Sequence, residues 1–141
     1  MQTMNRFVVM IGVAAMVLAS CQENIEKRFE REAREFTEKQ CPKKIHADIR
    51  IDSMSYSVDD RTFRYYYTLS GQMDNAEAMA SQKATFREML LNGVINSVET
   101  KKPKEEGVSF EYIYRSETTG EVMVSELFTR EDYSPGSGGG E

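Results

Sequence analysis

The sequence is poor in the residues on which most enzymes depend. Among its 141 residues there is no tryptophan, one histidine (His46) and two cysteines (Cys21 and Cys41). A zinc site needs several Cys or His residues at chelating spacing, a catalytic triad needs a histidine between a nucleophile and an acid, and phosphate binding needs a glycine-rich turn. None of these patterns occurs before the glycine-rich C-terminal segment. We therefore predict a protein that is not an enzyme and binds no metal or cofactor.

The chain also lacks a surplus of positive charge. Eighteen Lys and Arg residues stand against 23 Asp and Glu residues, which gives a formal net charge of -5. The one lysine-rich segment, Lys101 to Lys104, is balanced by Glu99, Glu105 and Glu106. Proteins that bind nucleic acid neutralise phosphates with clustered basic residues, so no nucleic-acid partner is expected. The length leaves room for one folded domain.

The first twenty residues have the pattern of an export signal. They contain no acidic residue and one basic residue, Arg6, which precedes an apolar run from Phe7 to Ala19. This is typical of the hydrophobic region of a signal peptide. A helix of that length rises roughly 20 Å, less than the ~30 Å hydrocarbon core, which disfavours the alternative of a permanent transmembrane anchor.

The end of this segment, Leu18-Ala19-Ser20-Cys21, resembles the lipobox of bacterial lipoproteins. The resemblance implies cleavage between Ser20 and Cys21, removal of residues 1–20, and attachment of acyl chains such as palmitate to Cys21. Two or three such chains hold a protein stably on a membrane. Gln22 stands where an aspartate would favour the inner membrane, so the resemblance implies an outer-membrane lipoprotein of the bacterial cell envelope. An acid behind the cysteine, here Glu23, also occurs in surface-export signals of Bacteroidetes lipoproteins, so periplasm-facing and surface-exposed orientations both stay open.

Lipidation of Cys21 leaves Cys41 without a partner for an intrachain disulfide. Two interpretations of Cys41 stay open: a small buried residue at a helix end, or a free thiol that forms an intermolecular disulfide. A catalytic thiol is not expected, because His46 lies on a segment whose alternation points it away from the apolar face.

Periodicity predicts an α+β domain. Ile25, Phe29, Ala33 and Phe36 form the apolar stripe of a helix over residues 23–40 that ends before Pro42. Two strands are expected next, over residues 45–58 and 62–70, and the first should have a bulge or break at Asp52-Ser53. A helix from about 74 to 98 follows, with Asp74 as its N-cap, and then a surface loop over residues 99–107. The last expected elements are strands 108–115 and 121–129.

The element order is therefore α-β-β-α-β-β. It predicts a two-layer α+β sandwich in which an antiparallel four-stranded sheet carries two helices on one face. We expect the domain to comprise residues 21–133, anchored through Cys21, and the Gly/Ser-rich segment 134–141 to be a disordered tail.

The strand segments 51–56, 63–69 and 107–115 also resemble a group of small uncharacterised bacterial envelope proteins, which share a YxYTL hairpin, a helix and a GVxxxYxY hairpin. The resemblance covers residues 41–133 and implies no activity. Many members carry a C-terminal cysteine that this chain lacks. The order of elements is similar to that of PepSY-like and β-lactamase-inhibitor-like modules, which is an analogy of topology only.

Alternation in the tyrosine-rich strands divides their side chains between two faces. If the series from Phe63 to Leu69 and from Val108 to Tyr114 faces the helices, then Arg64, Tyr66, Ile113 and Arg115 face outward as a candidate partner surface. Cross-strand Tyr and Arg residues also suit a half-solvated sheet that binds nothing.

Two functions follow. The first is a non-catalytic, lipid-anchored envelope lipoprotein that acts as an interaction or adaptor module for another envelope protein. The second is a small-ligand-binding or enzyme-inhibitor module of the periplasm or cell surface. An adaptor predicts a partly apolar patch on the sheet, whereas a ligand module predicts a concave pocket of at least about 300 Å³.

Overall fold

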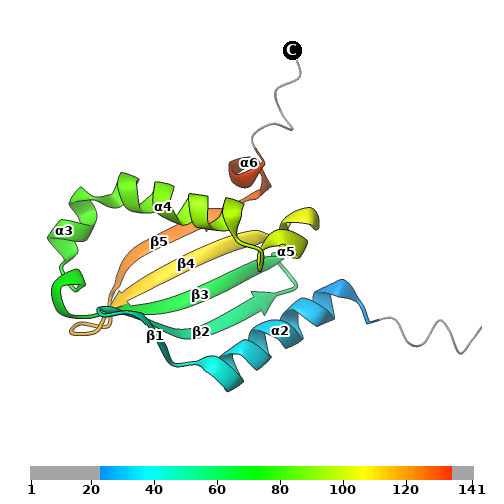
Figure 1. Ribbon diagram of the computed structural model, residues 1–141, viewed down its shortest axis with the longest axis horizontal. Coiled ribbons are helices and arrows are strands. Elements are labelled where there is room, and N and C mark those ends of the chain that lie inside the picture. The colour runs from blue at the N-terminus through cyan, green and yellow to red at the C-terminus, as the bar shows by residue number, and fades with distance from the viewer. Residues whose placement is uncertain (1–22, 135–141) are drawn as a thin grey trace, which may run out of the picture.

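The computed structural model describes residues 23–134 (Figure 1). The predicted signal peptide, the lipidation site Cys21 and residues 135–141 of the predicted tail lie outside the described residues. Alternating apolar residues form the five strands of one sheet, in the order β1-β2-β3-β4-β5. These strands are β1 (Lys43–His46), β2 (Ile49–Ser57), β3 (Thr62–Leu69), β4 (Ser109–Ser116) and β5 (Val122–Phe128).

The helices lie on one face of this sheet (Figure 1). They are α2 (Ile25–Gln40), α3 (Ala76–Ser81), α4 (Lys83–Asn96), α5 (Lys101–Glu105) and α6 (Arg130–Tyr133), and a 3₁₀ turn spans Gly71–Met73. Phe29 and Ala33 of α2 share a core cluster with Val94 of α4 and with Phe63 and Phe110 of the sheet. The predicted two-layer arrangement, with helices on one face only, is therefore confirmed.

Helix α2 ends at the predicted residue, Gln40, and begins at Ile25, two residues after the predicted start. The Asn24 side chain accepts a hydrogen bond from the Glu26 backbone N–H (3.0 Å), which satisfies a free donor of the first turn. Phe29 and Ala33 are buried against the sheet. No helix in residues 23–134 is long and apolar enough to cross a membrane.

The sheet differs from the prediction in the pairing of its central strands. Both predicted hairpins are present, because β2 pairs antiparallel with β3 and β4 pairs antiparallel with β5. However, β3 and β4 pair in parallel, so the sheet is mixed, and the prediction of a wholly antiparallel sheet is wrong. The α3–α4 segment is the cause, because it carries the chain from the end of β3 back along the sheet to the start of β4.

The sheet also has a fifth strand, which the alternation of apolar residues did not predict. The run from Ile45 to Ile51 reads as one strand, but residues 47 and 48 form a turn that divides it into β1 and β2. The Asp48 carbonyl accepts a hydrogen bond from the Ser70 N–H (2.9 Å), and Gly71 lies against the Asp48 side chain. The irregularity predicted at Asp52-Ser53 is confirmed, because the β2–β3 register shifts between Ile51 and Ser53.

The second predicted helix differs in three details. Asn75 is the N-cap of α3, and its side chain accepts from the Ala78 N–H (3.0 Å). Asp74, the predicted N-cap, instead accepts hydrogen bonds from the backbone N–H (3.1 Å) and the hydroxyl (2.7 Å) of Thr118. The helix is interrupted at Gln82, and the predicted loop 99–107 contains the short helix α5.

Candidate docking site

Three cross-strand aromatic pairs run along β3 and β4 on the face that carries the helices. The parallel register sets Phe63 beside Phe110, Tyr65 beside Tyr112, and Tyr67 beside Tyr114. The Tyr65 and Tyr112 ring centroids are 4.8 Å apart at an interplanar angle of 7°. Those of Tyr67 and Tyr114 are 4.5 Å apart at 8°. Such pairs stabilise the sheet beyond the area that they bury.

The hydroxyls of Tyr65, Tyr67, Tyr112 and Tyr114 make no hydrogen bond within the described part of the chain. We call these four residues the tyrosine floor. Burial raises the pKa of Tyr67 to about 12 and the pKa of the other three phenols as well, so all four are neutral donors at physiological pH. Among residues 23–134, Glu126 Oε1 is the buried polar side-chain atom without a partner, so the four tyrosine hydroxyls reach solvent, where a bound molecule can replace water as their hydrogen-bond partner.

An apolar pocket lies at one end of the tyrosine floor. It encloses about 350 Å³ and is lined by residues of β1, β2, the 3₁₀ turn, α3 and α4, among them His46, Met73, Met79, Phe86 and Met89. The Phe86 ring meets the Tyr114 ring edge-on with centroids 5.0 Å apart, which connects this methionine pocket to the floor. Methionine is flexible and polarisable, so pockets lined with it adapt to different side chains.

A second pocket lies at the other end. It encloses about 230 Å³ between α2 and the segment around α5, and its lining includes Glu32, Phe36, Tyr65, Glu99 and Pro103. The Glu99 carboxylate has no ion pair in residues 23–134, and its charge contributes to the raised pKa of Tyr65 and Tyr67. The lining of this acidic pocket includes no basic residue. The tyrosine floor and the two pockets together are the interhelical site.

Two observations concern metal binding and the reactivity of Cys41. No group of three or more His, Cys, Asp or Glu side chains in residues 23–134 is placed to hold a metal ion. Reactive cysteines have a lowered pKa, whereas burial, assisted by the nearby Asp52 charge, raises the pKa of Cys41. Cys41 is partly buried just after α2, packed against the second core cluster.

The four residues predicted as a partner surface lie together on the opposite, helix-free face of the sheet. Arg64 donates to Glu111 (2.7 Å) and to Asp60 (2.5 Å). Tyr66 and Ile113 are cross-strand neighbours, and Arg115 donates to the Gly120 carbonyl (3.3 Å).

The charge of Arg64 on this face is therefore satisfied by Glu111 and Asp60. The second function predicted a groove beside the tyrosine-rich strands, but no residue was assigned to the interhelical site on the other face. The signal in the sequence was the repeated Phe-x-Tyr-x-Tyr spacing of residues 63–67 and 110–114, in which the parallel register pairs Phe with Phe and Tyr with Tyr.

Comparison with protein families gives one match. A family model described as a domain of unknown function, DUF8479, matches residues 24–124. The chain belongs to this family. No curated protein sequence matches the chain. The DUF8479 domain includes α2, all of β1 to β4 and the first three residues of β5, and so contains the whole tyrosine floor.

Solved structures with a similar fold come from bacteria. A provisionally assigned secreted protein of Pseudomonas aeruginosa is 19% identical, with a TM-score of 0.66, and the match covers 77% of this chain and 91% of that one. The pilotin EpsS of the Vibrio vulnificus type 2 secretion system is 12% identical (TM-score 0.57; 78% and 92% covered). The type II secretion pilotin AspS of Vibrio cholerae is 17% identical (TM-score 0.54; 82% and 97% covered). At these identities the likeness of the DUF8479 domain to them is one of fold.

Proposed function

We propose that this chain is a non-catalytic adaptor of the bacterial cell envelope. Acyl chains on Cys21 hold it at the outer membrane, and the interhelical site binds a segment of another envelope protein. The observation that carries the proposal is the tyrosine floor, where four hydroxyls without hydrogen-bond partners lie in a row between an apolar and an acidic pocket.

The geometry favours a helical segment as the bound partner. β3 and β4 are interior strands, so their backbone groups pair with β2, with β5 and with each other. An extended segment laid on this face would find no free backbone to pair with, whereas a helix satisfies its own backbone and docks through side chains. An apolar side chain fits the methionine pocket, and a basic side chain fits beside Glu99 in the acidic pocket.

Fold similarity supports an envelope role. The two Vibrio pilotins are components of type II secretion systems, and nearly their whole solved chains are covered by this fold. The lipobox-like segment before α2 supports attachment to the membrane.

The helix-free face is a weaker docking surface. Its charged groups are paired within the face, as Arg64 is with Glu111 and Asp60, and Arg50 with Asp52 (2.6 Å). A partner that displaced these pairs would have to replace their hydrogen bonds. The interhelical site has apolar surface and free hydroxyls that need no such exchange.

A second function, binding of a small ligand, is favoured by one observation. The methionine pocket, about 350 Å³ and almost wholly apolar in its lining, is within the range of small-molecule sites. A ligand confined to this pocket would leave the acidic pocket and most of the tyrosine floor unused.

Photo-crosslinking in living cells tests the adaptor proposal. A photoreactive residue is placed at Met89 in the methionine pocket, at Tyr66 on the helix-free face, and at Arg31 on the exposed side of α2 as a control. We expect one defined protein to be captured from Met89 and not from Arg31. The same capture from Tyr66 alone would move the docking surface to the helix-free face, and no capture from either would remove the adaptor function.

A further inference from the structure

The corner between α4 and α5 carries the most exposed apolar side chain of the described residues. Val98 is 85% exposed, and two further exposed aliphatic residues are Ile95 in the last turn of α4 (39%) and Val58 in the turn between β2 and β3 (43%). Isolated exposed apolar residues are common on protein surfaces. Val98, Ile95 and Val58 lie on elements at the same end of the domain (Figure 1), and we call these three residues the apolar tip.

The corner that carries Val98 is firmly built. The buried Thr100 hydroxyl donates to the carbonyls of Val94 (2.7 Å) and Ser97 (3.0 Å), on either side of the bend. Lys104 Nζ donates to the Ile95 carbonyl (2.6 Å), which ties α5 back to the end of α4. Val98 is therefore held outward by ordered hydrogen bonds within a structured corner.

The apolar tip lies at the end of the domain where the chain enters from Cys21. Figure 1 shows the start of α2, the β2–β3 turn and α5 at the same end of the sheet. Two contacts of Arg61, in that turn, join them: Arg61 Nε donates to Glu26 of α2 (2.8 Å), and Arg61 Nη2 donates to the carbonyl of Glu106 (3.1 Å), just after α5.

The connection to the lipidation site is short. Glu23 is fixed by an ion pair with Arg31 on α2. Cys21 precedes Glu23 by two residues, which span at most about 7 Å when fully extended. If Cys21 carries acyl chains, the end of the domain that bears the apolar tip lies against the bilayer surface.

We propose that the apolar tip rests in the headgroup region of the bilayer that holds the Cys21 acyl chains. This inference rests on the membrane anchor of the proposed function. The contact fixes the orientation of the domain, so that the long axis of the sheet points away from the membrane and the methionine pocket faces away from it.

Charge contributes little to this contact. Lys27, Lys101 and Lys104 at this end have no ion pair among residues 23–134, and neither do Asp59 and Glu99, so these free groups leave one positive charge in excess. Lys102 is already paired with Glu106 (3.1 Å). The contact is therefore apolar and does not require anionic lipid.

A fluorescence experiment on vesicles tests the proposal without relying on lipidation or on a protein partner. Residues 21–141 carrying Cys21→Ser and Cys41→Ser are tethered by an N-terminal hexahistidine tag to phosphatidylcholine vesicles containing a nickel-chelating lipid. An environment-sensitive NBD label is attached at Val98→Cys or, as a matched control, at Val122→Cys. Val122 is also an exposed valine, at the start of β5 and therefore at the opposite end of the sheet (Figure 1).

We expect the label at position 98 to brighten and shift to shorter wavelength when the chain is tethered, and to be quenched by nitroxide-labelled lipid. The label at position 122 should do neither. Three results would overturn the proposal of an apolar membrane contact at this end. They are an unchanged label at position 98, equal changes at both positions, and a change at position 98 that requires added phosphatidylglycerol. None of these outcomes bears on partner binding at the interhelical site.

Discussion

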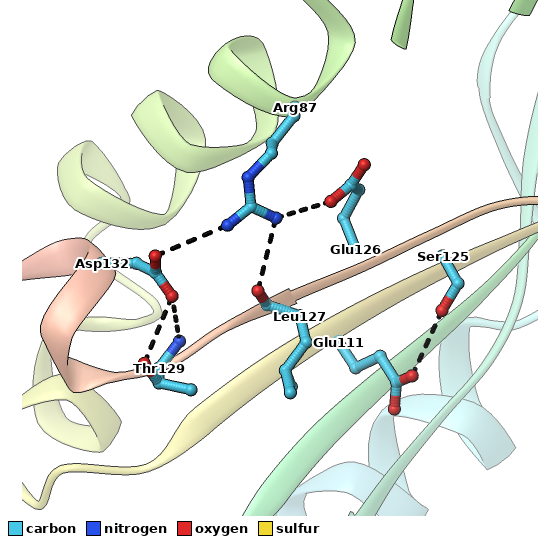
Figure 2. Close-up of polar contacts among 7 residues, drawn as sticks. All are labelled: Arg87, Glu111, Ser125, Glu126, Leu127, Thr129 and Asp132. Atoms are coloured by element: carbon cyan, nitrogen blue, oxygen red, sulfur yellow. Dashed lines mark hydrogen bonds and ion pairs between the residues drawn. The ribbon is translucent and has the colours of Figure 1, made fainter. Parts of the chain in front are cut away.

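A partly buried ion pair fastens α4 to the last strand and the C-terminal helix (Figure 2). Arg87 of α4 donates from Nη1 to Glu126 Oε2 (2.5 Å) and to the Leu127 carbonyl (3.4 Å), and from Nη2 to Asp132 Oδ1 (3.5 Å). The guanidinium carbon lies 4.7 Å from the centre of the Phe128 ring, within range of a cation–π interaction. The pair therefore holds three elements that meet at one edge of the sheet.

The two partners differ in burial. The Glu126 side chain is 7% exposed, and its second oxygen, Oε1, has no hydrogen-bond partner in the described residues. Replacing Arg87→Met keeps much of the side-chain volume but leaves a buried carboxylate without its counter-charge. Loss of one partner of a buried pair costs about 3–5 kcal/mol. Because Arg87 is itself 39% exposed, we expect the low end, about 3 kcal/mol of the free energy of unfolding.

The chain offers a matched control in the Arg28–Glu32 pair of α2. Its N···O distance, 2.7 Å, is similar, but its side chains are 49% and 42% exposed. Arg28→Met should therefore cost less than about 0.5 kcal/mol. Urea unfolding followed by circular dichroism measures both variants, and a change of midpoint at constant slope isolates the stability difference. Equal destabilisation by the two substitutions would refute the argument from burial.

Three further predictions concern backbone, thiol and phenol groups. Gly71 has φ +53, and a Cβ there would lie 2.5 Å from Asp48 Oδ1, so Gly71→Ala should lower the free energy of unfolding by at least about 1–2 kcal/mol. Gly93 lies in open space on α4, so Gly93→Ala should raise it by about 0.5–1 kcal/mol. Changes of the same sign in the two variants would contradict the argument from backbone conformation. Burial raises the pKa of Cys41, so iodoacetamide should modify it more slowly in the folded protein than in urea, and equal rates would show an accessible thiol. Folding raises the pKa of Tyr67 from 10.0 to about 12. The neutral Tyr67 phenol therefore contributes its full stabilisation of the folded state below pH 10, and this contribution is lost between pH 10 and 12. Absorbance at 295 nm, measured in a Tyr66→Phe variant that lacks the outward-facing phenol, and circular dichroism should therefore change together in that range. Ionisation of the remaining phenols with an intact fold would contradict the burial of the tyrosine floor.

Local patterns in the sequence predicted most elements of the domain. The apolar stripe of α2 and the alternation in β3 and β4 each depend on neighbouring residues, and both are confirmed by burial in the structure. The bulge near Asp52 was predicted for the same reason, since a slip of one residue in alternation requires it.

The errors arise where distant segments decide the outcome. The parallel pairing of β3 with β4 depends on how α3 and α4 cross the sheet, which no local pattern reports. Asp74 reads as an N-cap from its neighbours, but Thr118, 44 residues later, competes for its carboxylate. The turn at residues 47–48 forms although the apolar alternation continues through it.

The candidate site was hidden for the same reason. The helix-facing orientation of each floor tyrosine was one of two alternatives in the sequence, and its ring partner and free hydroxyl depend on the parallel register and on the spacing of α2 and α4. Sequence reasoning therefore favoured the outward face of Arg64, Tyr66, Ile113 and Arg115, because composition is visible in a sequence and pocket shape is not.

The most direct test of the adaptor account asks whether the anchor and the interhelical site act on the same partner. The protein captured from Met89 would be followed by cell fractionation in three strains, which carry the wild-type chain, Cys21→Ser, or Glu99→Lys, which reverses the charge of an exposed residue in the acidic pocket. The account predicts that the partner is found in the outer membrane with the wild-type chain and is lost from it in both variants. A partner whose distribution is unchanged in both would contradict the claim that this lipoprotein couples a membrane anchor to a bound protein.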